Sequence, residues 1–430
     1  MPERLPLEAA VELVRPVDTL GIPLGPGQPG AFLHALGARE HFDELTVSGA
    51  LLGDLYELFT RPGVRYRSGF FGPVERMLRD AGHDIAFVPA DFRRFAPLLE
   101  LAAPRVMATA AATPDAAGAM SLSLHAGGTV RELHCCGADP DRVLVVEVNP
   151  QLPRTLGLPE HPHELHVDEA DVIVEGDRAP VTIPDAEETP VDRAIAEHAR
   201  AFVSDGCTLQ TGIGGIPSTF ARLLADGPGG DYGIHSEMFT TGLMHLHQAG
   251  KVSNRKGVYD GFSVTTFAAG TAELYEWLDE RDDVRFLPVE QVNAPAIIAR
   301  NRRMVTVNGA VAVDLHGQLM ADTIEGVQFS GVGGHEDFVA APGQELEDRS
   351  LVCLPSTVAV DGTPVSRIVA RFASGAVVTT PRHQLDVVVT EHGAAELRGL
   401  TVRERARALA AIADPAHRED LLDAAERLPL

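Results

Sequence analysis

The stretch Cys207-Thr-Leu-Gln-Thr-Gly-Ile-Gly-Gly-Ile-Pro-Ser218 decides the fold, because a short apolar strand enters a glycine loop that opens a helix. We predict the strand at Cys207–Gln210 and the start of the helix near Pro217. A strand at Tyr232–Ser236 and a helix near Thr241–Gln248 follow. Alternation of this kind indicates an α/β fold with a parallel or mostly parallel sheet covered by helices.

The same alternation extends to both sides of this stretch. Thr189-Pro190-Val191-Asp192 predicts the start of a helix over about 190–204, since Thr is a good N-cap and Pro suits the first turn. Met304–Val313 and Gln318–Asp322 are predicted to form a β-hairpin that turns at His316-Gly317. We also expect strands at Val143–Val148, Phe262–Ala268, Val284–Val289, Leu351–Leu354, Arg367–Phe372, Val377–Thr380 and Leu385–Thr390, and helices at Ala272–Leu278, Val402–Ile412 and Pro415–Arg427.

Chain length and composition predict two domains. At 430 residues the chain is too long for one ordinary core, and 45% apolar residues with 41 Gly and 30 Pro fit a compact, loop-rich protein. The acidic, proline-containing segment Glu175–Glu188 is the predicted boundary. We therefore expect an N-terminal domain over 1–185 and a C-terminal domain over 186–430.

Charge and cysteine content exclude several classes of function. The net charge of −25 argues against nucleic-acid binding, which requires Lys and Arg to neutralise phosphates. No apolar run approaches the roughly 18 residues of a membrane helix, and the first residues lack the pattern of a secretory signal. The 4 cysteines are too few for a disulfide framework. We expect a cytoplasmic protein with reduced thiols.

The glycine loop Gly212–Pro217 is a candidate phosphate site. Backbone N–H groups and the helix dipole converge there, although glycines also serve tight turns between a strand and a helix. The loop lacks the Lys-Ser/Thr pair of a P-loop and departs from the Rossmann spacing. Two lysines, Lys251 and Lys256, flank Arg255 and are candidate phosphate contacts, or they reflect only an arginine-rich composition.

Glu237 is the candidate nucleophile. It stands at the end of the strand that follows the glycine loop, and ligands of open α/β sheets bind outside the carboxyl ends of the strands. The same position also suits a carboxylate that faces only water. A later cluster, Phe329-Ser-Gly-Val-Gly-Gly334, offers consecutive amides for an oxyanion hole, or is a turn before a helix.

Metal and serine-hydrolase chemistry are not predicted. His161, His163 and His166 are closely spaced, but Pro162 disfavours the helical geometry of a His-Glu-x-x-His site. His134-Cys135-Cys136 has no second ligand pair at zinc-site spacing. The chain contains no Gly-x-Ser-x-Gly elbow.

Ordered motifs along nearly the whole chain resemble one family. The chain is similar to the acetyl-CoA hydrolase/transferase family of class I CoA-transferases, most closely the 4-hydroxybutyrate and butyryl-CoA:acetate CoA-transferase branch. The matching motifs are Val148-Asn-Pro-Gln-Leu-Pro-Arg-Thr155, Gly212-Ile-Gly-Gly-Ile-Pro217, Gly233-Ile-His-Ser-Glu-Met238, Val292-Asn293 followed by Pro295, Ile298-Ala-Arg-Asn301, Ser330-Gly-Val-Gly-Gly334, Leu354-Pro-Ser-Thr357, Val388-Val-Thr-Glu-His-Gly393 and Leu397-Arg-Gly399.

The resemblance implies a function and a set of site residues. Glu237 falls on the catalytic glutamate, and Asn293 on an asparagine that lines the active site. The implied CoA-binding residues are Gly212, Gly214, Gly215, Ile216, Pro217, Ser218, Phe329, Gly331, Gly333 and Gly334. The implied fold is two tandem open α/β domains of the class I type, with acyl-CoA and a small carboxylic acid as substrates, no permanently bound cofactor, no metal and a homodimeric assembly.

The sequence departs from the family pattern at several positions. Thr241 stands where the family usually has Asp, His335 replaces a common Gln, and Gly309 replaces a common Ser. These changes leave open which acyl group is transferred. Transfer requires an ionised Glu237, so we expect no large upward shift of its pKa. Hydrolysis of acyl-CoA by the same glutamate and a catalytically silent CoA-binding protein are the alternatives.

Overall fold

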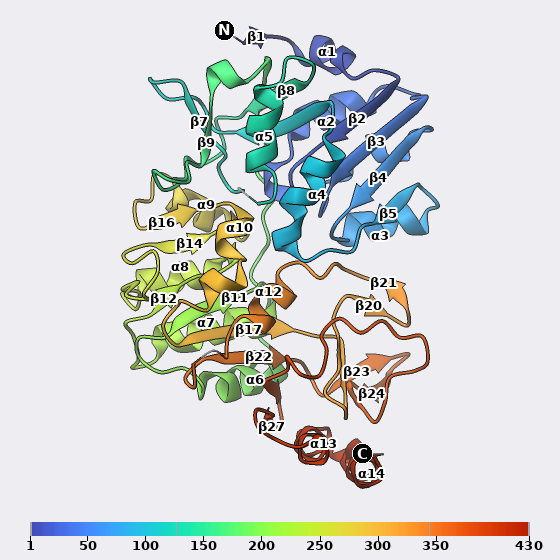
Figure 1. The fold of residues 1–430 in the computed structure, drawn as a ribbon, viewed down its shortest axis with the longest axis vertical. Helices are drawn as coiled ribbons and strands as arrows, with labels where there is room; N and C mark the ends of the chain where they lie inside the picture. The colour runs from blue at the N-terminus through green and yellow to red at the C-terminus, as the bar shows by residue number, and fades with distance from the viewer. Residues whose placement is uncertain (1, 126, 344, 429–430) are drawn as a thin grey trace. The chain divides into compact units, whose positions relative to one another are not determined.

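The computed structural model describes residues 2–125, 127–343 and 345–428 (Figure 1). Contacts divide it into two compact units. The first comprises Met1–Ile183, Glu237–Phe239 and Val264–Ala294, and the second comprises Pro184–Ser236, Thr240–Ser263 and Pro295–Leu430. By contacts, Glu237 therefore belongs to the first unit. Sequence domains over 1–185 and 186–430 remain a proposal.

The described part of the first unit contains an eight-stranded sheet in which all neighbouring strands are parallel. In order across the sheet, its strands are β1 (Glu3–Arg4), β10 (Val172–Glu175), β8 (Val143–Val148), β6 (Val106–Ala111), β2 (Val17–Gly21), β3 (Glu44–Gly49), β4 (Val64–Ser68) and β5 (Ile85–Phe87). The helices of this unit are α1 (Leu7–Ala10), α2 (Gly30–Gly37), α3 (Pro73–Asp80), α4 (Phe95–Ala102), α5 (Val130–Gly137), α9 (Ala272–Leu278) and α10 (Val289–Val292). Figure 1 shows α2, α4 and α5 beside the strands.

Residue type explains the central strands of this sheet. The strand β6 is buried at each position, and β8 (Val-Leu-Val-Val-Glu-Val) is apolar except at Glu147 and is buried from Leu144 onward. Continuous apolar runs are typical of parallel strands that helices cover on both faces. The strand predicted at Val143–Val148 is therefore confirmed.

The second unit contains a six-stranded sheet in its described residues. It is parallel except for the last pair, β26 with β27. In order, the strands are β12 (Gly233–Ile234), β11 (Thr208–Thr211), β17 (Met304–Gly309), β22 (Arg349–Cys353), β26 (Val387–Thr390) and β27 (Gly393–Glu396). The helices are α6 (Pro190–Arg200), α7 (Gly215–Asp226), α8 (Thr241–Gln248), α11 (Pro295–Ile298), α12 (His335–Ala340), α13 (Val402–Ala411) and α14 (Pro415–Glu426). The expected mostly parallel α/β architecture is confirmed in both units.

Smaller strand pairs complete the two units. The pairs of the first unit are β7 (Ala119–Ser121) with β9 (Glu164–His166), and β13 (Met238–Phe239) with β15 (Phe267–Ala268). The second unit adds β18 (Ala312–Asp314), β19 (Leu319–Met320) and β25 (Ile368–Val369) as one small sheet, and the hairpins β20 (Thr323–Ile324) with β21 (Val327–Gln328) and β23 (Thr357–Val360) with β24 (Thr363–Ser366). Strand β14 (Ser263–Thr265) pairs with β16 (Val284–Phe286).

The N-terminus of α6 forms as its sequence predicts. The Thr189 side chain accepts a hydrogen bond from the Asp192 N–H at 3.1 Å, and the Asp192 carboxylate accepts from the Thr189 hydroxyl at 2.7 Å. Such a capping box satisfies N–H groups that the first turn leaves without intrahelical partners. The helices predicted at Thr241–Gln248 and Ala272–Leu278 also form with those bounds.

Two predicted elements were wrong. Met304–Val313 is not one arm of a hairpin, because β17 lies between β11 and β22 in the large sheet; the hairpin at His316-Gly317 joins the short strands β18 and β19. Val377–Thr380 forms no strand, and only Thr380 makes an isolated bridge, to Leu319. Val377 and Val378 are 45% and 39% exposed, so their apolar character does not reflect burial in a sheet.

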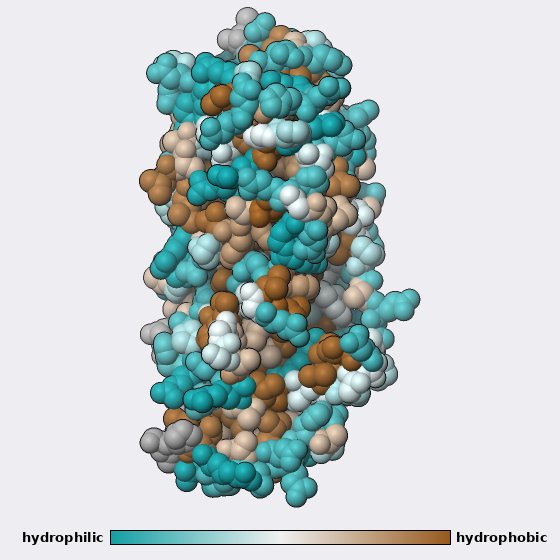
Figure 2. All heavy atoms as spheres, turned by 90° about the vertical axis from the view of Figure 1, so that its right-hand side faces the viewer, coloured by the Kyte–Doolittle hydropathy of each residue, from teal (hydrophilic) through white to brown (hydrophobic). Residues whose placement is uncertain are grey.

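The surface combines apolar and polar areas. Exposed apolar side chains occur on the hairpins β20–β21 and β23–β24, including Ile324 (41%), Val327 (55%) and Val360 (50%). Figure 2 shows apolar patches interrupted by polar residues on one face of the molecule. No helix within the described ranges is long and apolar enough to span a membrane.

Candidate active site

The backbone of Glu237 is fixed by three hydrogen bonds within the first unit. Its carbonyl oxygen accepts from the Thr266 N–H at 3.0 Å, the Phe267 N–H at 3.3 Å and the Thr265 hydroxyl at 2.9 Å. Directly after Glu237, β13 pairs in parallel with β15. The side chain of Glu237 is partly exposed. Its position is therefore set by main-chain contacts, and the residue is not fully buried.

Asn293 holds the Glu237 carboxylate. It directly follows α10, and its own N–H donates to the Val289 carbonyl at 2.8 Å. Its side-chain Nδ2 donates to Glu237 Oε2 at 2.6 Å, while Asn293 itself is 0% exposed. A hydrogen bond to a carboxylate is strongest when the carboxylate is ionised, so this contact favours the charged form of Glu237. The structure thus brings these two predicted site residues together.

A chain of backbone hydrogen bonds connects the supports of Glu237 and Asn293. The Gly127 N–H donates to the Thr266 carbonyl at 3.1 Å, and the Gly127 carbonyl accepts from the Val289 N–H at 3.1 Å. Thr266 holds Glu237, and Val289 begins the short helix that presents Asn293. Sequence reasoning did not find Thr265, Thr266 or Gly127, because no local motif links them to the glutamate.

The glycine loop borders a cavity of about 310 Å³ within the second unit. Gly214 caps α7 with a φ of +119°, a backbone conformation that favours glycine. A Cβ on Gly215 would lie 2.7 Å from Asp192 Oδ2, so a side chain there would collide with the cap of α6. The lining residues are Asp192, Gly212, Ile213, Gly214, Gly215, Ile216, Pro217, Val307, Asn308, Gly309, Ala310, Cys353, Pro355 and Arg367.

Five of the six predicted residues of this loop, Gly212 and Gly214 through Pro217, line the cavity. Ser218 does not belong to the described lining; it lies in the first turn of α7, where its N–H donates to the Gly214 carbonyl at 3.1 Å. That CoA occupies the loop remains a prediction.

The later glycine cluster forms a turn that leads into α12. The N–H groups of Phe329 and Ser330 donate to the Asp322 carbonyl at 2.9 and 3.0 Å, and Gly333 has a φ of +55°. Phe329 is 40% exposed, and Gly334 caps α12. The described lining of the glycine-loop cavity includes none of the residues from Phe329 to Gly334. An oxyanion hole or CoA contact at Gly331, Gly333 and Gly334 remains a prediction.

Lys256 cannot serve as a surface phosphate contact, contrary to expectation. Its side chain is 0% exposed, and its Nζ donates to the carbonyls of Val258 and Tyr259 at 2.7 and 2.6 Å. Burial lowers the pKa of this ammonium to about 7. Lys251 Nζ donates to the Gly227 carbonyl at 2.6 Å. Only Arg255 of the three is exposed, and it forms an ion pair with Asp231.

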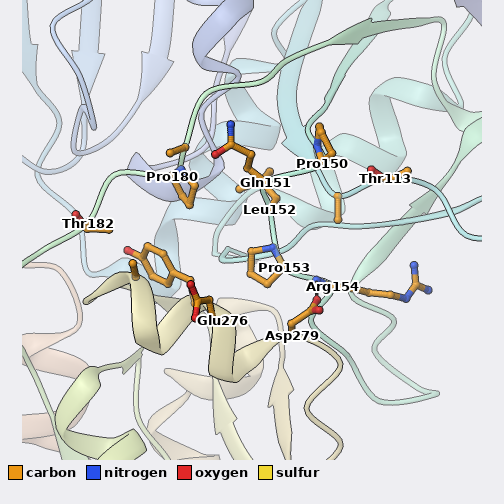
Figure 3. A pocket seen from close by; sticks show the side chains of 14 residues that line it. Thr113, Pro150, Gln151, Leu152, Pro153, Arg154, Pro180, Thr182, Glu276 and Asp279 are labelled. Atoms are coloured by element: carbon orange, nitrogen blue, oxygen red, sulfur yellow. Dashed lines mark hydrogen bonds between the residues drawn. The ribbon is translucent and has the colours of Figure 1, made fainter.

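A further cavity of about 530 Å³ lies within the first unit (Figure 3). Its walls are the segment Pro150–Arg154, the segment Ala179–Thr182 and α9. Arg154 donates from its backbone to Asp279 Oδ1 at 2.7 Å and forms an ion pair with Asp115 at 2.9 Å. The lining includes part of the motif 148–155 but neither Glu237 nor Asn293.

Within residues 2–125, 127–343 and 345–428, no group of three or more His, Cys, Asp or Glu side chains is arranged to hold a metal ion. The closely spaced histidines have separate surroundings. His163 contacts the Ser123 carbonyl through Nε2 at 2.8 Å and stacks on Phe286, and burial lowers its pKa to about 4. His166 contacts the Ala117 carbonyl through Nε2 at 3.0 Å.

Comparisons with known proteins agree on one family. Residues 270–425 match the acetyl-CoA hydrolase/transferase C-terminal domain. Over 98% of the chain and 94% of the relative, the sequence is 37% identical to a succinyl-CoA:cyclohexane-1-carboxylate CoA transferase of Geobacter metallireducens. It is 39% identical to a 4-hydroxybutyrate coenzyme A transferase of Clostridium kluyveri over 66% of this chain and 65% of the relative.

A solved structure extends this similarity to the fold. The crystal structure of RipA from Yersinia pestis matches with a TM-score of 0.89 and 32% identity, over 99% of this chain and 97% of the other. Proteins named as hydrolases are also similar: an acetyl-CoA hydrolase of Neurospora crassa is 30% identical over 53% of this chain and 44% of its own length.

Proposed function

Because this chain belongs to the acetyl-CoA hydrolase/transferase family of CoA-transferring enzymes, we propose that it exchanges CoA between short-chain carboxylic acids through a covalent intermediate on Glu237. The observation that carries the proposal is the 2.6 Å hydrogen bond from Asn293 Nδ2 to Glu237 Oε2. It joins a buried amide donor to a partly exposed carboxylate whose backbone is fixed. An oriented carboxylate of this kind is suited to nucleophilic attack.

The proposed reaction is a double displacement. A carboxylate oxygen of Glu237 attacks the thioester carbonyl and the carbon–sulfur bond breaks. CoA is released as the thiolate, and an acyl-glutamyl anhydride forms on the enzyme. The thiolate then attacks the glutamyl carbonyl, the first acid leaves as a carboxylate, and a glutamyl-CoA thioester remains. A second carboxylate reverses these steps and leaves as its CoA thioester. Charge and atoms balance without water or an external base, and the kinetics are ping-pong.

Asn293 contributes orientation and charge. A donor 2.6 Å from Oε2 restrains rotation of the carboxylate and favours its ionised form. In the anhydride and in the thioester the glutamyl group carries no negative charge, so the hydrogen bond from Asn293 to its remaining oxygen weakens. When the glutamate is released again, the hydrogen bond strengthens. Asn293 is thus proposed to stabilise the free nucleophile between the two halves of the reaction.

Trapping the intermediate tests the proposal. The enzyme is incubated with acyl-CoA alone, treated with borohydride, which reduces a thioester to an alcohol, and digested for mass spectrometry. We expect a reduced side chain at Glu237 and none in Glu237→Gln treated in parallel. Labelling of another residue, or no change at Glu237 while CoA exchange proceeds, would contradict the proposed role.

Hydrolysis is the second candidate, and the similarity to proteins named acetyl-CoA hydrolase favours considering it. In that reaction water attacks the intermediate on Glu237 instead of a second carboxylate. Following the release of CoA thiol from acetyl-CoA separates the two. Free CoA thiol that accumulates without added carboxylate identifies a hydrolase. A transferase releases no net thiol and instead converts the added carboxylate into its CoA thioester, which chromatography detects. The alternative of a catalytically silent CoA-binding protein is disfavoured, since the similar proteins are named as enzymes.

The acyl specificity and the assembly are further parts of the proposal. A screen should pair acetyl-CoA with butyrate, 4-hydroxybutyrate and propionate. It should also pair succinyl-CoA with cyclohexane-1-carboxylate, because a similar protein is named for these two substrates. We also propose a homodimer that acts in the cytoplasm without a permanently bound cofactor. Light scattering on the purified chain, whose monomer mass is 45.9 kDa, tests the assembly.

A further inference from the structure

An arginine whose Nε makes no hydrogen bond within the described residues lies in the wall of the glycine-loop cavity. Arg367 immediately precedes β25, and its backbone N–H donates to the Ser356 carbonyl at 2.8 Å. Among the described residues, no hydrogen bond or ion pair reaches its guanidinium, and its Nε is buried. Burial lowers the pKa of Arg367, with the Glu391 carboxylate acting in the opposite direction. A partly desolvated cation without a hydrogen-bond acceptor is unfavourable in a folded protein.

A second donor in the same cavity wall is the amide of Asn308. Its Nδ2 is buried and makes no hydrogen bond within the part of the chain that the structure describes. Asn308 lies near the carboxyl end of β17, where Val307 pairs with Thr211 and Gly309 pairs with Cys353. The carboxyl ends of three neighbouring parallel strands therefore meet at this cavity, which is where open α/β sheets bind ligands.

The third set of donors is the N-terminus of α7. This helix has 12 residues and opens on the glycine loop, so its first N–H groups and the positive end of its dipole face the same cavity. Gly212 and Gly214 carry no side chain that would block approach. Asp192 is the acidic group among the described lining residues, and its carboxylate accepts hydrogen bonds from Thr189 in the cap of α6.

We propose that Arg367 and Asn308, together with the first amides of α7, bind a phosphate group of the CoA substrate. That the ligand is CoA rests on the proposed function. That the ligand is an anion is inferred from the side-chain donors without acceptors in the cavity wall. A guanidinium presents paired N–H donors to two oxygens of a phosphate, and helix N-termini bind phosphates through backbone amides. Arg367 thereby takes the cationic role that the sequence suggested for Lys251, Arg255 and Lys256.

The test measures binding to the full-length protein by isothermal titration. The ligands are CoA, dephospho-CoA, which lacks the 3′-phosphate, and pantetheine, which lacks all phosphates. We expect Arg367→Gln to raise the Kd of CoA roughly ten- to hundredfold, which corresponds to a lost hydrogen bond to a charged group. Arg371→Gln is the matched control, because Arg371 is exposed and lies outside the described lining; its Kd should stay within about twofold of the wild type.

The three ligands separate the outcomes. If Arg367→Gln weakens the binding of CoA alone, Arg367 contacts the 3′-phosphate. If it weakens the binding of both CoA and dephospho-CoA, Arg367 contacts the pyrophosphate. Either result supports the proposal. An unchanged Kd of CoA, or an equal loss for pantetheine, overturns it. Asn308→Asp places a negative charge in the same wall and should weaken CoA in the same pattern, which keeps the test decisive should Arg367→Gln fail to fold.

The outcome is independent of the trapping experiment at Glu237. If wild-type protein binds CoA through Arg367 but forms no adduct at Glu237, the proposed transferase mechanism is refuted and the phosphate site stands. If the adduct forms while Arg367→Gln binds CoA as the wild type does, the phosphate site is refuted and the mechanism stands.

Discussion

Replacing Asn293 by Asp tests the electrostatics of the proposed nucleophile with almost no change in side-chain shape. The native Nδ2 donates to Glu237 Oε2 at 2.6 Å, and Asn293 is 0% exposed. In Asn293→Asp an oxygen takes the place of this donor, so two carboxylates face each other. One of them then retains a proton until the pH is raised, and the pair titrates as a unit.

The size of the effect follows from two contributions. The loss of a hydrogen bond to a charged group is about 1.5–3 kcal/mol, or roughly one to two pH units. Repulsion between two unit charges about 4 Å apart adds up to about 4 kcal/mol at an effective dielectric constant of about 20, reduced by solvent at the partly exposed Glu237. We therefore expect the acidic limb of the kcat/KM profile to move upward by roughly two to four pH units.

The assay is the pH profile of kcat/KM for acyl-CoA, measured for wild type, Asn293→Asp and Asn293→Ala. Asn293→Asp should be strongly impaired at pH 6 and regain activity as the pH is raised. Asn293→Ala removes the donor without adding charge, so its limb should move by roughly one to two units only. A profile of Asn293→Asp that coincides with the wild-type profile, in a variant that folds normally, would refute this account of the contact.

Three further predictions concern stability and the glycine loop. Burial lowers the pKa of Lys256 to about 7, whereas an unfolded lysine keeps its proton to about 10.5. The free energy of unfolding of the wild type, measured in urea, should therefore rise relative to that of Lys256→Met as the pH increases from 7 to 10. A difference between the two proteins that does not change with pH would contradict this prediction. Burial lowers the pKa of His335 to about 4, below the 6.5 of an unfolded histidine, so the wild-type protein should lose stability as the pH drops from 6.5 toward 4. His335→Gln lacks this titration, so in urea titrations the stability difference between wild type and His335→Gln should be smaller at pH 5 than at pH 7. Gly214→Ala should lower the free energy of unfolding by about 1 kcal/mol or more and weaken CoA binding, since the φ of Gly214 is +119°. The control is Gly230→Ala, which lies outside the cavity lining and whose added Cβ would be 3.8 Å from its nearest neighbour; equal losses in the two variants, by calorimetry and by CoA titration, would contradict this prediction.

Local sequence predicted much of the second unit. The capping pattern Thr189–Asp192 predicted the start of α6, and the alternation of strands, glycines and helices predicted β11, α7 and α8. These elements depend on residues close to one another in the chain, so periodicity and capping chemistry are sufficient. The same reasoning failed for β17, because its pairing with Arg349–Cys353 is decided more than 40 residues away.

The candidate site divides in the same way. Motifs predicted Glu237, Asn293 and the glycine loop as separate residues with family roles. The sequence did not show that Asn293 donates to Glu237 across a separation of 56 residues, or that Lys256 is buried among carbonyl groups. Burial and partner choice depend on what other segments pack nearby, which no local pattern contains.

The sequence by itself thus determined the α/β class and the family, and it pointed to Glu237 as the candidate nucleophile, since these inferences depend on residue types at fixed short spacings. Only the tertiary structure showed which cationic side chains are buried among carbonyl groups and which one lines a cavity. Two lysines drew attention in the sequence, yet the unpaired guanidinium in the glycine-loop cavity belongs to Arg367, a residue predicted only as part of a strand. The physical reason is that a charge binds a ligand only where folding leaves it desolvated, accessible and without an internal partner.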